Sequence, residues 1–307
     1  MGGNIGAAVN NPLALAVARR SSFEARLYVR GAGLLRIEAL NSNDVEVNGQ
    51  LVTIAAQSLF TTDNLVTIAG ASTGAAMVAS TVYYVYLSNL AATFPEALRA
   101  SAVSPTPDSY GTLYLDLDGT PGHEWRFVGV VFTNAAVQFL DDAGARHLAN
   151  YYNRQPKALY TCPGYTDDAA DTFYNSVASA TFAKINGGTG DTVSFLTFDE
   201  LGVTLGVCAS VRANGAADSH VGLAVNDFGG TLEARAAAIV QTAALDVAVS
   251  VQLAPIVGLG SALGGTVNEA SVVIENGGLA TSIYADFDAA GATADVPATY
   301  LWGLVWC

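Results

Sequence analysis

The sequence predicts an all-β protein, with an N-terminal β-rich anchor domain followed by a C-terminal antiparallel β-sandwich or jelly roll and one short helix. Three observations predict this class. Apolar and polar residues alternate with a period of two along many short runs. The runs are rich in β-branched and aromatic residues, and clusters of the turn residues Gly, Asn and Asp separate them.

In the first half of the chain we expect short strands joined by turns. In the first strand Arg26 and Arg30 fall on one face, and Leu27 falls on the other. Asn48-Gly49 separates two later runs and predicts a two-residue hairpin turn, because both residues tolerate positive φ. The strands are predicted at residues 23–30, 35–40, 44–47, 51–55, 65–69, 81–87, 113–117 and 125–133.

An irregular segment at residues 150–166 follows this half. It combines Pro156 and Pro163 with four tyrosines and has almost no periodicity, and prolines so close together do not fit a central strand. We therefore place a domain boundary here. The predicted organisation is a docking segment at residues 1–22, an anchor or shoulder domain at 23–148, a neck at 149–166 and a distal β-sandwich at 167–307.

The second half again predicts strands. Residues 203–211 alternate without a break and form the clearest strand of the chain. Residues 231–241 (TLEARAAAIVQ) are rich in Ala, with Glu233 near the start, and predict the one helix. The strands are predicted at residues 180–185, 192–198, 204–213, 220–225, 244–253, 269–275, 281–287 and 299–305.

Composition limits the function. Charged residues make up 13% of the chain and the formal net charge is −14, whereas an average soluble domain is about 25% charged. So acidic a chain would repel the phosphate backbone of a nucleic acid, so we expect no nucleic acid as a partner. No stretch reaches the roughly 18 apolar residues of a membrane helix, so we expect no membrane as a partner. Arg19 and Arg20 follow the apolar part of the N-terminus, the reverse of a secretory signal. A surface so poor in charge predicts contact with other copies of the chain or with a large assembly.

The cysteines Cys162, Cys208 and Cys307 are odd in number and have no CxxC spacing. We expect free thiols rather than a disulfide framework or a metal site. Cys307, the last residue of the sequence, is expected to be the most accessible of the three.

One local motif suggests chemistry. Residues 113–120 (LYLDLDGT) fit the first motif of haloacid dehalogenase-type phosphotransferases, with Asp116 as nucleophile and Asp118 as acid/base. That chemistry also needs a phosphate-binding Lys and a late acidic pair on an α/β sheet. Asp141-Asp142 follows too soon, no Lys lies between, and a strand is expected where a helix should follow. A strand that ends in an Asp-Gly turn is the better interpretation.

Four further clusters favour structural interpretations. His123-Glu124 and residues 218–220 (DSH) each lack a second histidine at metal-binding spacing. Residues 187–192 (GGTGDT) have no P-loop lysine and precede a strand, and residues 167–171 (DDAAD) depart from EF-hand spacing. We therefore expect no catalytic, cofactor-binding or metal-binding residues, no cofactor, and a protein that is not an enzyme.

The order of several motifs resembles one family of proteins. TVYYVYL at residues 81–87 is followed by WRFVGVVFTN at 125–134, FLDD at 139–142 and NYYNR at 150–154. This order resembles virion proteins of tailed bacteriophages, which comprise tail fibres, spikes and head-decoration proteins. The hydrophobic end at residues 300–306 (YLWGLVW) is similar to the final strand of their distal domains.

The resemblance implies a non-enzymatic structural protein on the surface of a phage-like virion, made in the host cytoplasm. It implies a homotrimer, whose N-terminal segment at residues 1–22 docks onto other virion proteins of the capsid or the tail. A host-surface glycan is a further candidate partner. The alternatives are a carbohydrate-binding or carbohydrate-cleaving tailspike and a bacterial surface adhesin module.

Overall fold

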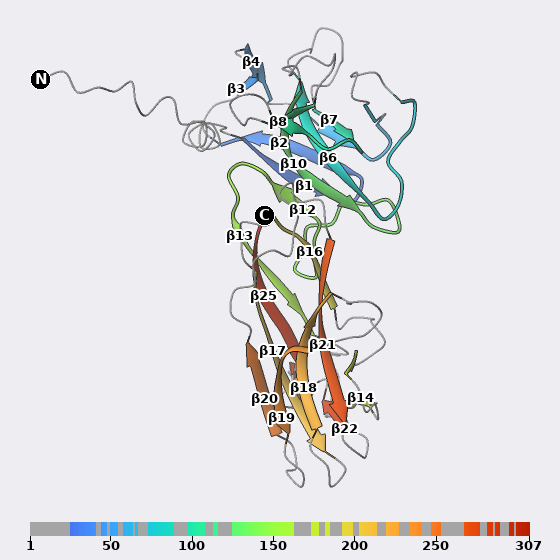
Figure 1. Cartoon of the computed structure of the whole chain (residues 1–307), viewed down its shortest axis with the longest axis vertical. Helices are drawn as coiled ribbons and strands as arrows, with labels where there is room; N and C mark the ends of the chain where they lie inside the picture. Colours follow the sequence, from blue (N-terminus) through green and yellow to red (C-terminus); the bar gives the residue numbers. More distant parts are fainter. Residues whose placement is uncertain are drawn as a thin grey trace, which may run out of the picture.

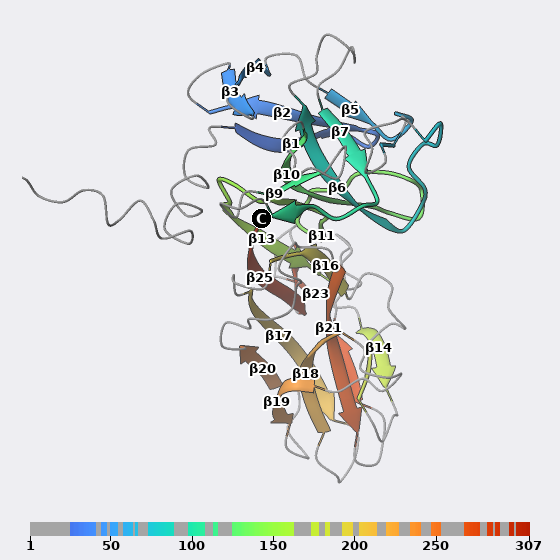
Figure 2. The same ribbon diagram turned by 45° about the horizontal axis from the view of Figure 1, so that its top comes forward.

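The chain forms two bodies stacked along its long axis (Figures 1 and 2), and none of the described residues lies in a helix. Within that part of the chain no helix could therefore span a membrane. The computed structural model describes residues 25–40, 44–47, 50–54, 58–63, 65–66, 73–88, 98–107, 113–115, 125–162, 173–177, 182–184, 192–198, 203–213, 219–226, 234–240, 247–252, 267–276, 281–284, 286–288, 295–297 and 299–307.

The upper body, residues 25–150, contains a six-stranded sheet, a three-stranded sheet and a hairpin. The six-stranded sheet has the order β7-β6-β10-β9-β8, with β12 also paired to β10, and the three-stranded sheet has the order β1-β2-β5. The strands are β1 Ala25–Gly31, β2 Leu34–Ala39, β3 Asp44–Val47, β4 Gln50–Thr53, β5 Ser58–Phe60, β6 Thr81–Ser88, β7 Leu98–Ser101, β8 Thr106–Pro107, β9 Leu113–Leu115, β10 Trp125–Thr133, β11 Ala145–Arg146 and β12 Leu148–Asn150.

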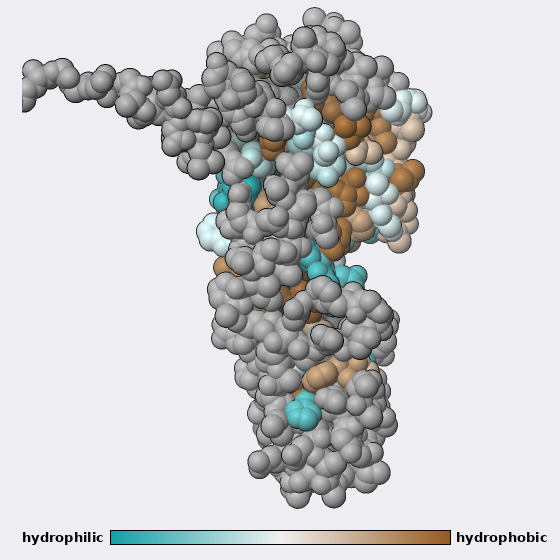
Figure 3. Space-filling model, viewed as in Figure 1, coloured by the Kyte–Doolittle hydropathy of each residue, from teal (hydrophilic) through white to brown (hydrophobic). Residues whose placement is uncertain are grey.

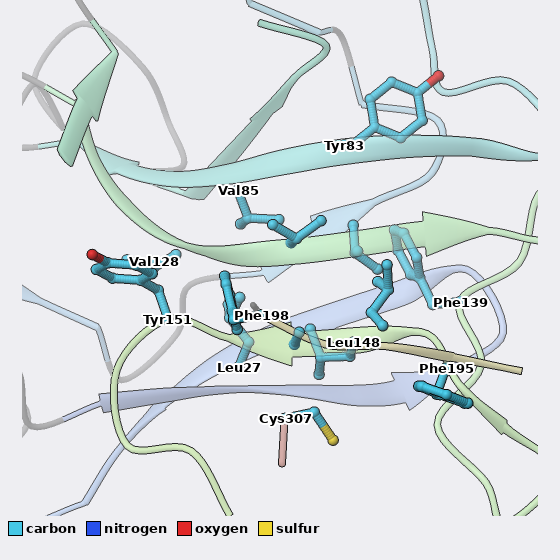
Figure 4. Packing of buried hydrophobic residues seen from close by; sticks show 14 of the residues in the cluster. Leu27, Tyr83, Val85, Val128, Phe139, Leu148, Tyr151, Phe195, Phe198 and Cys307 are labelled. Carbon is cyan, nitrogen blue, oxygen red and sulfur yellow. The ribbon is translucent and has the colours of Figure 1, made fainter. Parts of the chain in front are cut away.

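The core of the upper body lies around β10. This strand is apolar along nearly its whole length because it has neighbours on both edges and buried side chains on both faces. The buried residues Leu27, Val85 and Leu148 gather beside it from three other strands (Figure 4). The β3–β4 register, Val47↔Gln50, leaves two residues for the turn and confirms the hairpin expected at Asn48-Gly49.

The lower body, residues 156–307, is built around two six-stranded sheets packed face to face, one of which includes β11 of the upper body, and this confirms the all-β prediction. One sheet has the order β13-β25-β17-β22-β14 with β20 paired to β17, and the other has the order β11-β16-β21-β18-β19 with β15 paired to β21. The strands are β13 Pro156–Thr161, β14 Phe173–Val177, β15 Ala183–Lys184, β16 Thr192–Leu196, β17 Thr204–Ala213, β18 Ser219–Val225, β19 Ala234–Val240, β20 Val247–Gln252, β21 Val267–Asn276, β22 Thr281–Tyr284, β23 Asp286–Asp288, β24 Asp295–Pro297 and β25 Tyr300–Trp306.

The helix predicted at residues 231–241 is wrong. Residues Ala234–Val240 form β19, whose backbone pairs with β18 from Ser219↔Val240 to Ala224↔Ala234. Alanine favours a helix over most other residues by less than about 0.7 kcal/mol per position. A row of backbone hydrogen bonds to a neighbouring strand outweighs so weak a preference.

The segment predicted as a neck, residues 149–166, contains strand β13. This strand lies at the edge of its sheet, pairs with β25, and begins at Pro156, a position that suits a residue without an amide hydrogen. The division into domains at 23–148 and 167–307 stays a prediction. The predicted docking segment, residues 1–22, lies outside the described residues.

Gly129 allows β10 and β12 to approach closely. A Cβ atom at this position would lie 2.6 Å from the carbonyl oxygen of Ala149 and 3.0 Å from Cδ1 of Leu27. We expect Gly129→Ala to lower the free energy of unfolding by about 2 kcal/mol, measured by urea denaturation. The control is Gly31→Ala, whose Cβ would meet nothing closer than 3.9 Å. Equal losses in the two variants would contradict this account.

Candidate functional site: the junction of the two bodies

The NYYNR motif, residues 150–154, connects the two bodies, and its first residue holds strand β1 in place. Asn150 accepts a hydrogen bond from the Leu27 amide on Oδ1 (2.7 Å) and donates one from Nδ2 to the Leu27 carbonyl (3.2 Å). The side-chain amide thus replaces a peptide group of a neighbouring strand. Both groups of Leu27 are buried and would otherwise lose these partners.

Asn153 makes a second connection to the start of β1. Its backbone has a positive φ of 52°, a conformation that Asn tolerates better than most residues. Its Nδ2 donates to the carbonyl of Ala25 at 3.0 Å, and its own carbonyl accepts from Nε and Nη2 of Arg26 at 2.8 and 2.5 Å. The connection and β1 are therefore joined by hydrogen bonds in both directions.

Arg154 lies between the two bodies. Its guanidinium carbon is 4.0 Å from the ring centre of Phe198 in the lower body and 5.4 Å from that of Tyr151. Its Nε donates to the carbonyls of Asn150 and Tyr151, both at 3.2 Å. One side chain thus stacks on an aromatic ring of the lower body and satisfies carbonyls of the connection.

Aromatic rings extend this contact into both cores (Figure 4). The centre of the Tyr151 ring lies 5.2 Å from the ring centre of Phe127 in β10 and 5.7 Å from that of Phe198. The neighbouring Tyr152 lies under the guanidinium of the buried Arg126, 5.0 Å from its carbon. The hydrophobic core is consequently continuous from one body to the other.

A second contact is made by residues 141–147 of the upper body, which insert between edge strands of the two lower sheets. The carbonyl of Ala143 accepts from the amide of Tyr160 in β13 at 2.8 Å, and the carbonyl of Gly144 accepts from the amide of Ser194 in β16 at 3.0 Å. The next two residues form β11, which pairs in parallel with β16. The upper body thus supplies an edge strand to a sheet of the lower body.

Three charged side chains stabilise this contact between residues 141–147 and the lower body. Asp141 pairs through Oδ1 with Nη1 of Arg146 (3.2 Å) and through Oδ2 with Nζ of Lys157 (2.5 Å). Nε of Arg146 also donates to the carbonyl of Ala158 in β13 at 2.9 Å. These side chains are only 13–17% exposed, so solvent screens their attraction less than it would at an open surface.

His147 is the one buried histidine among the described residues, and it lies in this contact. Its Nε2 is 2.6 Å from Oγ of Ser194, its ring meets Phe132 edge-on at 5.0 Å, and its Nδ1 has no partner among the described residues. A bare Nδ1 fits the neutral tautomer in which Nε2 carries the proton. Burial lowers the pKa of His147 to about 4, and the nearby carboxylates of Asp142 and Asp141 only partly oppose this.

The expectation that Cys307 is the most accessible thiol is wrong. Its side chain is buried, and its amide and carbonyl pair with the carbonyl and amide of Gln155 at 3.1 and 3.0 Å. Burial raises the pKa of its thiol to about 11. Cys162 and Cys208 are half-buried, and all three cysteines are free thiols, as expected.

The structure describes few of the other sequence candidates. Asp116, Asp118, His123-Glu124, residues 167–171 and residues 187–191 lie outside the described residues. His220 is half-buried in β18, and the carboxylate of Asp142 accepts from the amides of Gly144 and Ala145 within its own turn. In the part of the chain that the structure describes, no group of three or more His, Cys, Asp or Glu could hold a metal ion.

Sequence reasoning missed the residues that make the junction. It used NYYNR as a motif but assigned no contact to its side chains, and it gave no role to Arg126, His147 or Phe198. A usable signal was the placement of arginines beside aromatic residues, which favours stacked guanidinium groups. What this arrangement does is mechanical: hydrogen bonds, ion pairs and stacked rings fix one body against the other.

No protein-family model and no curated protein sequence match this chain. The chain has a TM-score of 0.31 and 10% identity to dimeric latent PorU from Porphyromonas gingivalis, covering 74% of this chain and 23% of that one. The structure of the infectious bursal disease virus Gx strain has a TM-score of 0.24 and 10% identity, covering 93% of this chain and 63% of that one. The VP2 subviral particle of infectious bursal disease virus has a TM-score of 0.25 and 10% identity, covering 94% of this chain and 66% of that one.

Two of these three structures are viral. The chain spans less than two thirds of the length of each of the three.

The stacked guanidinium of Arg154 gives the first prediction for this site. We expect Arg154→Ala to lower the free energy of unfolding by about 3 kcal/mol, because stacking and charged hydrogen bonds are lost together. Urea denaturation measures the loss, and small-angle X-ray scattering measures the relative position of the two bodies. Arg154→Lys should recover little, because an ammonium group lacks the planar fork.

The matched control is Arg30→Ala, which removes an exposed ion pair with Glu38 and should leave stability almost unchanged. If Arg154→Ala proved as mild as this control, the stacking would not hold the junction.

The buried imidazole of His147 predicts that the protein weakens in mild acid. The folded state holds this pKa near 4, below the ordinary 6.5, so between these values the unfolded chain binds a proton that the folded chain does not. The contribution of the neutral imidazole to the free energy of unfolding is therefore fully present above pH 6.5 and is lost as the pH falls toward 4.

Glutamine does not titrate in this range. Between about pH 7 and pH 5 we therefore expect the free energy of unfolding of His147→Gln to fall by about 2 kcal/mol less than that of the parent chain. Urea denaturation at both pH values measures the difference. Parallel losses in the two chains would show that His147 is not the titrating group.

Proposed function

We propose that the chain is a non-enzymatic structural component of a phage-like virion, an appendage or a decoration protein displayed on the particle surface. The supporting observation is the geometry of the NYYNR motif. Asn150, Tyr151, Asn153 and Arg154 each make a specific contact at the junction, and Tyr152 packs under Arg126. A short segment that fixes a distal β-sandwich on a β-rich base suits a protein that projects a domain from a particle.

Charge distribution supports self-association in such a particle. The chain has only 13 Lys and Arg residues, and several of the described arginines are bound inside the junction, where they add no charge to the surface. Burying a surface poor in charge between subunits has a small desolvation cost. We therefore propose a homotrimer, with residues 1–22 as the segment that docks onto capsid or tail proteins.

Light scattering and co-sedimentation test this proposal together. The purified chain should have the mass of a trimer and should sediment with isolated phage-like particles from the source of the sequence. A variant lacking residues 1–22 should keep its urea transition and its trimeric mass but stay in the supernatant. A stable monomer with no affinity for particles would overturn the proposal, and unchanged sedimentation of the shortened variant would overturn the role of residues 1–22.

A further inference from the structure

In one sheet of the lower body, the outward positions of β13 and β25, and those of β17 from Thr204 to Cys208, carry no charged residue. Along β13, β25 and β17 alternate residues point inward, where Leu159, Leu301 and Val207 join the core. Tyr160, Leu304 and Trp306, on the outward face, are among the exposed large apolar side chains of the described residues. The outward positions of β13, of β25 and of β17 as far as Cys208 are Pro156, Ala158, Tyr160, Tyr300, Trp302, Leu304, Trp306, Thr204, Gly206 and Cys208.

Trp302 lies flat on this face. Its register partner on β17 is Gly206, and a Cβ atom at Gly206 would lie 2.5 to 2.8 Å from the indole atoms Cε2, Cζ2 and Nε1. The indole therefore occupies the space that any other residue at position 206 would fill. One face of the ring rests on the sheet, so the opposite face of this half-buried side chain points outward.

Two tyrosines continue the platform. Tyr160 is the register partner of Trp302 on the other side and is 42% exposed. The rings of Tyr160 and Tyr300 are 6.0 Å apart at an interplanar angle of 39°. A cysteine holds one hydroxyl group in place, because the Cys162 thiol donates to the Tyr160 oxygen at 2.8 Å, and Tyr300 is the register partner of Cys208 on β17. We call Tyr160, Tyr300 and Trp302 the aromatic platform.

This chemistry matches a neutral sugar. The flat side of a pyranose presents C–H groups, which pack favourably on the negative face of an aromatic ring, and its edge presents hydroxyl groups that phenol oxygens can bind. A platform without charge pairs well with an uncharged ligand and offers no counter-ion to an acidic or basic one. The Trp302 ring lies against a glycine and the Tyr160 hydroxyl is held by a thiol, so these side chains lose little conformational freedom on binding.

We propose that the aromatic platform binds a neutral oligosaccharide, with one sugar stacked on Trp302 and the next beside Tyr160 and Tyr300. This site lies on the face of a sheet, on strands β13 and β25. The inference goes beyond the proposed function and does not depend on it, because binding is measured on the purified chain without particles. Failure of one therefore leaves the other standing.

The experiment titrates the full chain with maltohexaose, cellohexaose and chitohexaose, by calorimetry and by tryptophan fluorescence. We expect at least one of them to bind and to change the emission, and Trp302→Ala to weaken that binding by at least about tenfold. Trp302→Phe should keep part of the affinity. Gly206→Ala should weaken binding although the indole is still present, because the added Cβ displaces it.

The control is Phe60→Ala, which removes from the upper body an aromatic side chain that is 43% exposed, close to the 42% of Tyr160, and should leave binding unchanged. Urea denaturation of each variant separates lost binding from lost folding. The proposal is overturned if none of the three sugars binds at millimolar concentration or if Trp302→Ala binds as the parent does. A drop in light-scattering mass for Trp302→Ala, without sugar binding by the parent chain, would instead assign this face to contact between subunits.

Discussion

The connection from Asn150 to Arg154 is the constraint on which the two-body arrangement depends. Within these few residues the chain leaves β12 and enters β13, so several peptide groups lie in a buried place without a neighbouring strand. Buried peptide groups need hydrogen-bond partners, and here side chains provide them. The side-chain amide of Asn150 pairs with the peptide groups of Leu27, and Nε of Arg154 donates to two carbonyls of the connection. Leaving any of these polar groups without a partner would destabilise the arrangement of the two bodies.

Strand positions were the predictable part of the fold, because alternation reports directly on burial. Residues 204–213 were predicted as a strand and form β17, with Leu205 and Val207 buried and Thr204 half-buried. Where intrinsic preference was the signal, prediction failed. The Ala-rich stretch now seen in β19 has helical propensity, and only the presence of β18 beside it decides its conformation.

The junction was not predictable because its partners are distant in the sequence. Arg26 meets Asn153 across 127 residues, and His147 meets Ser194 across 47. Neither residue stands in a pattern that reports its partner. The same distance explains the wrong expectation for Cys307, whose burial follows from pairing with Gln155 rather than from its place in the sequence. Long-range pairing was the missing information.

The few charged side chains of the chain include a group at the junction of the two bodies. On the face seen in Figure 3, hydrophilic colour among the described residues lies near the junction and in separate spots on both bodies. Arg146 and Lys157 share the carboxylate of Asp141 there, while the outward side of the same strand carries Tyr160. Strand β13 thus has its cation on the side toward the upper body and its aromatic ring on the free side. Because Arg146 also binds the carbonyl of Ala158, the contact that joins the two bodies fixes the backbone from which the aromatic platform projects.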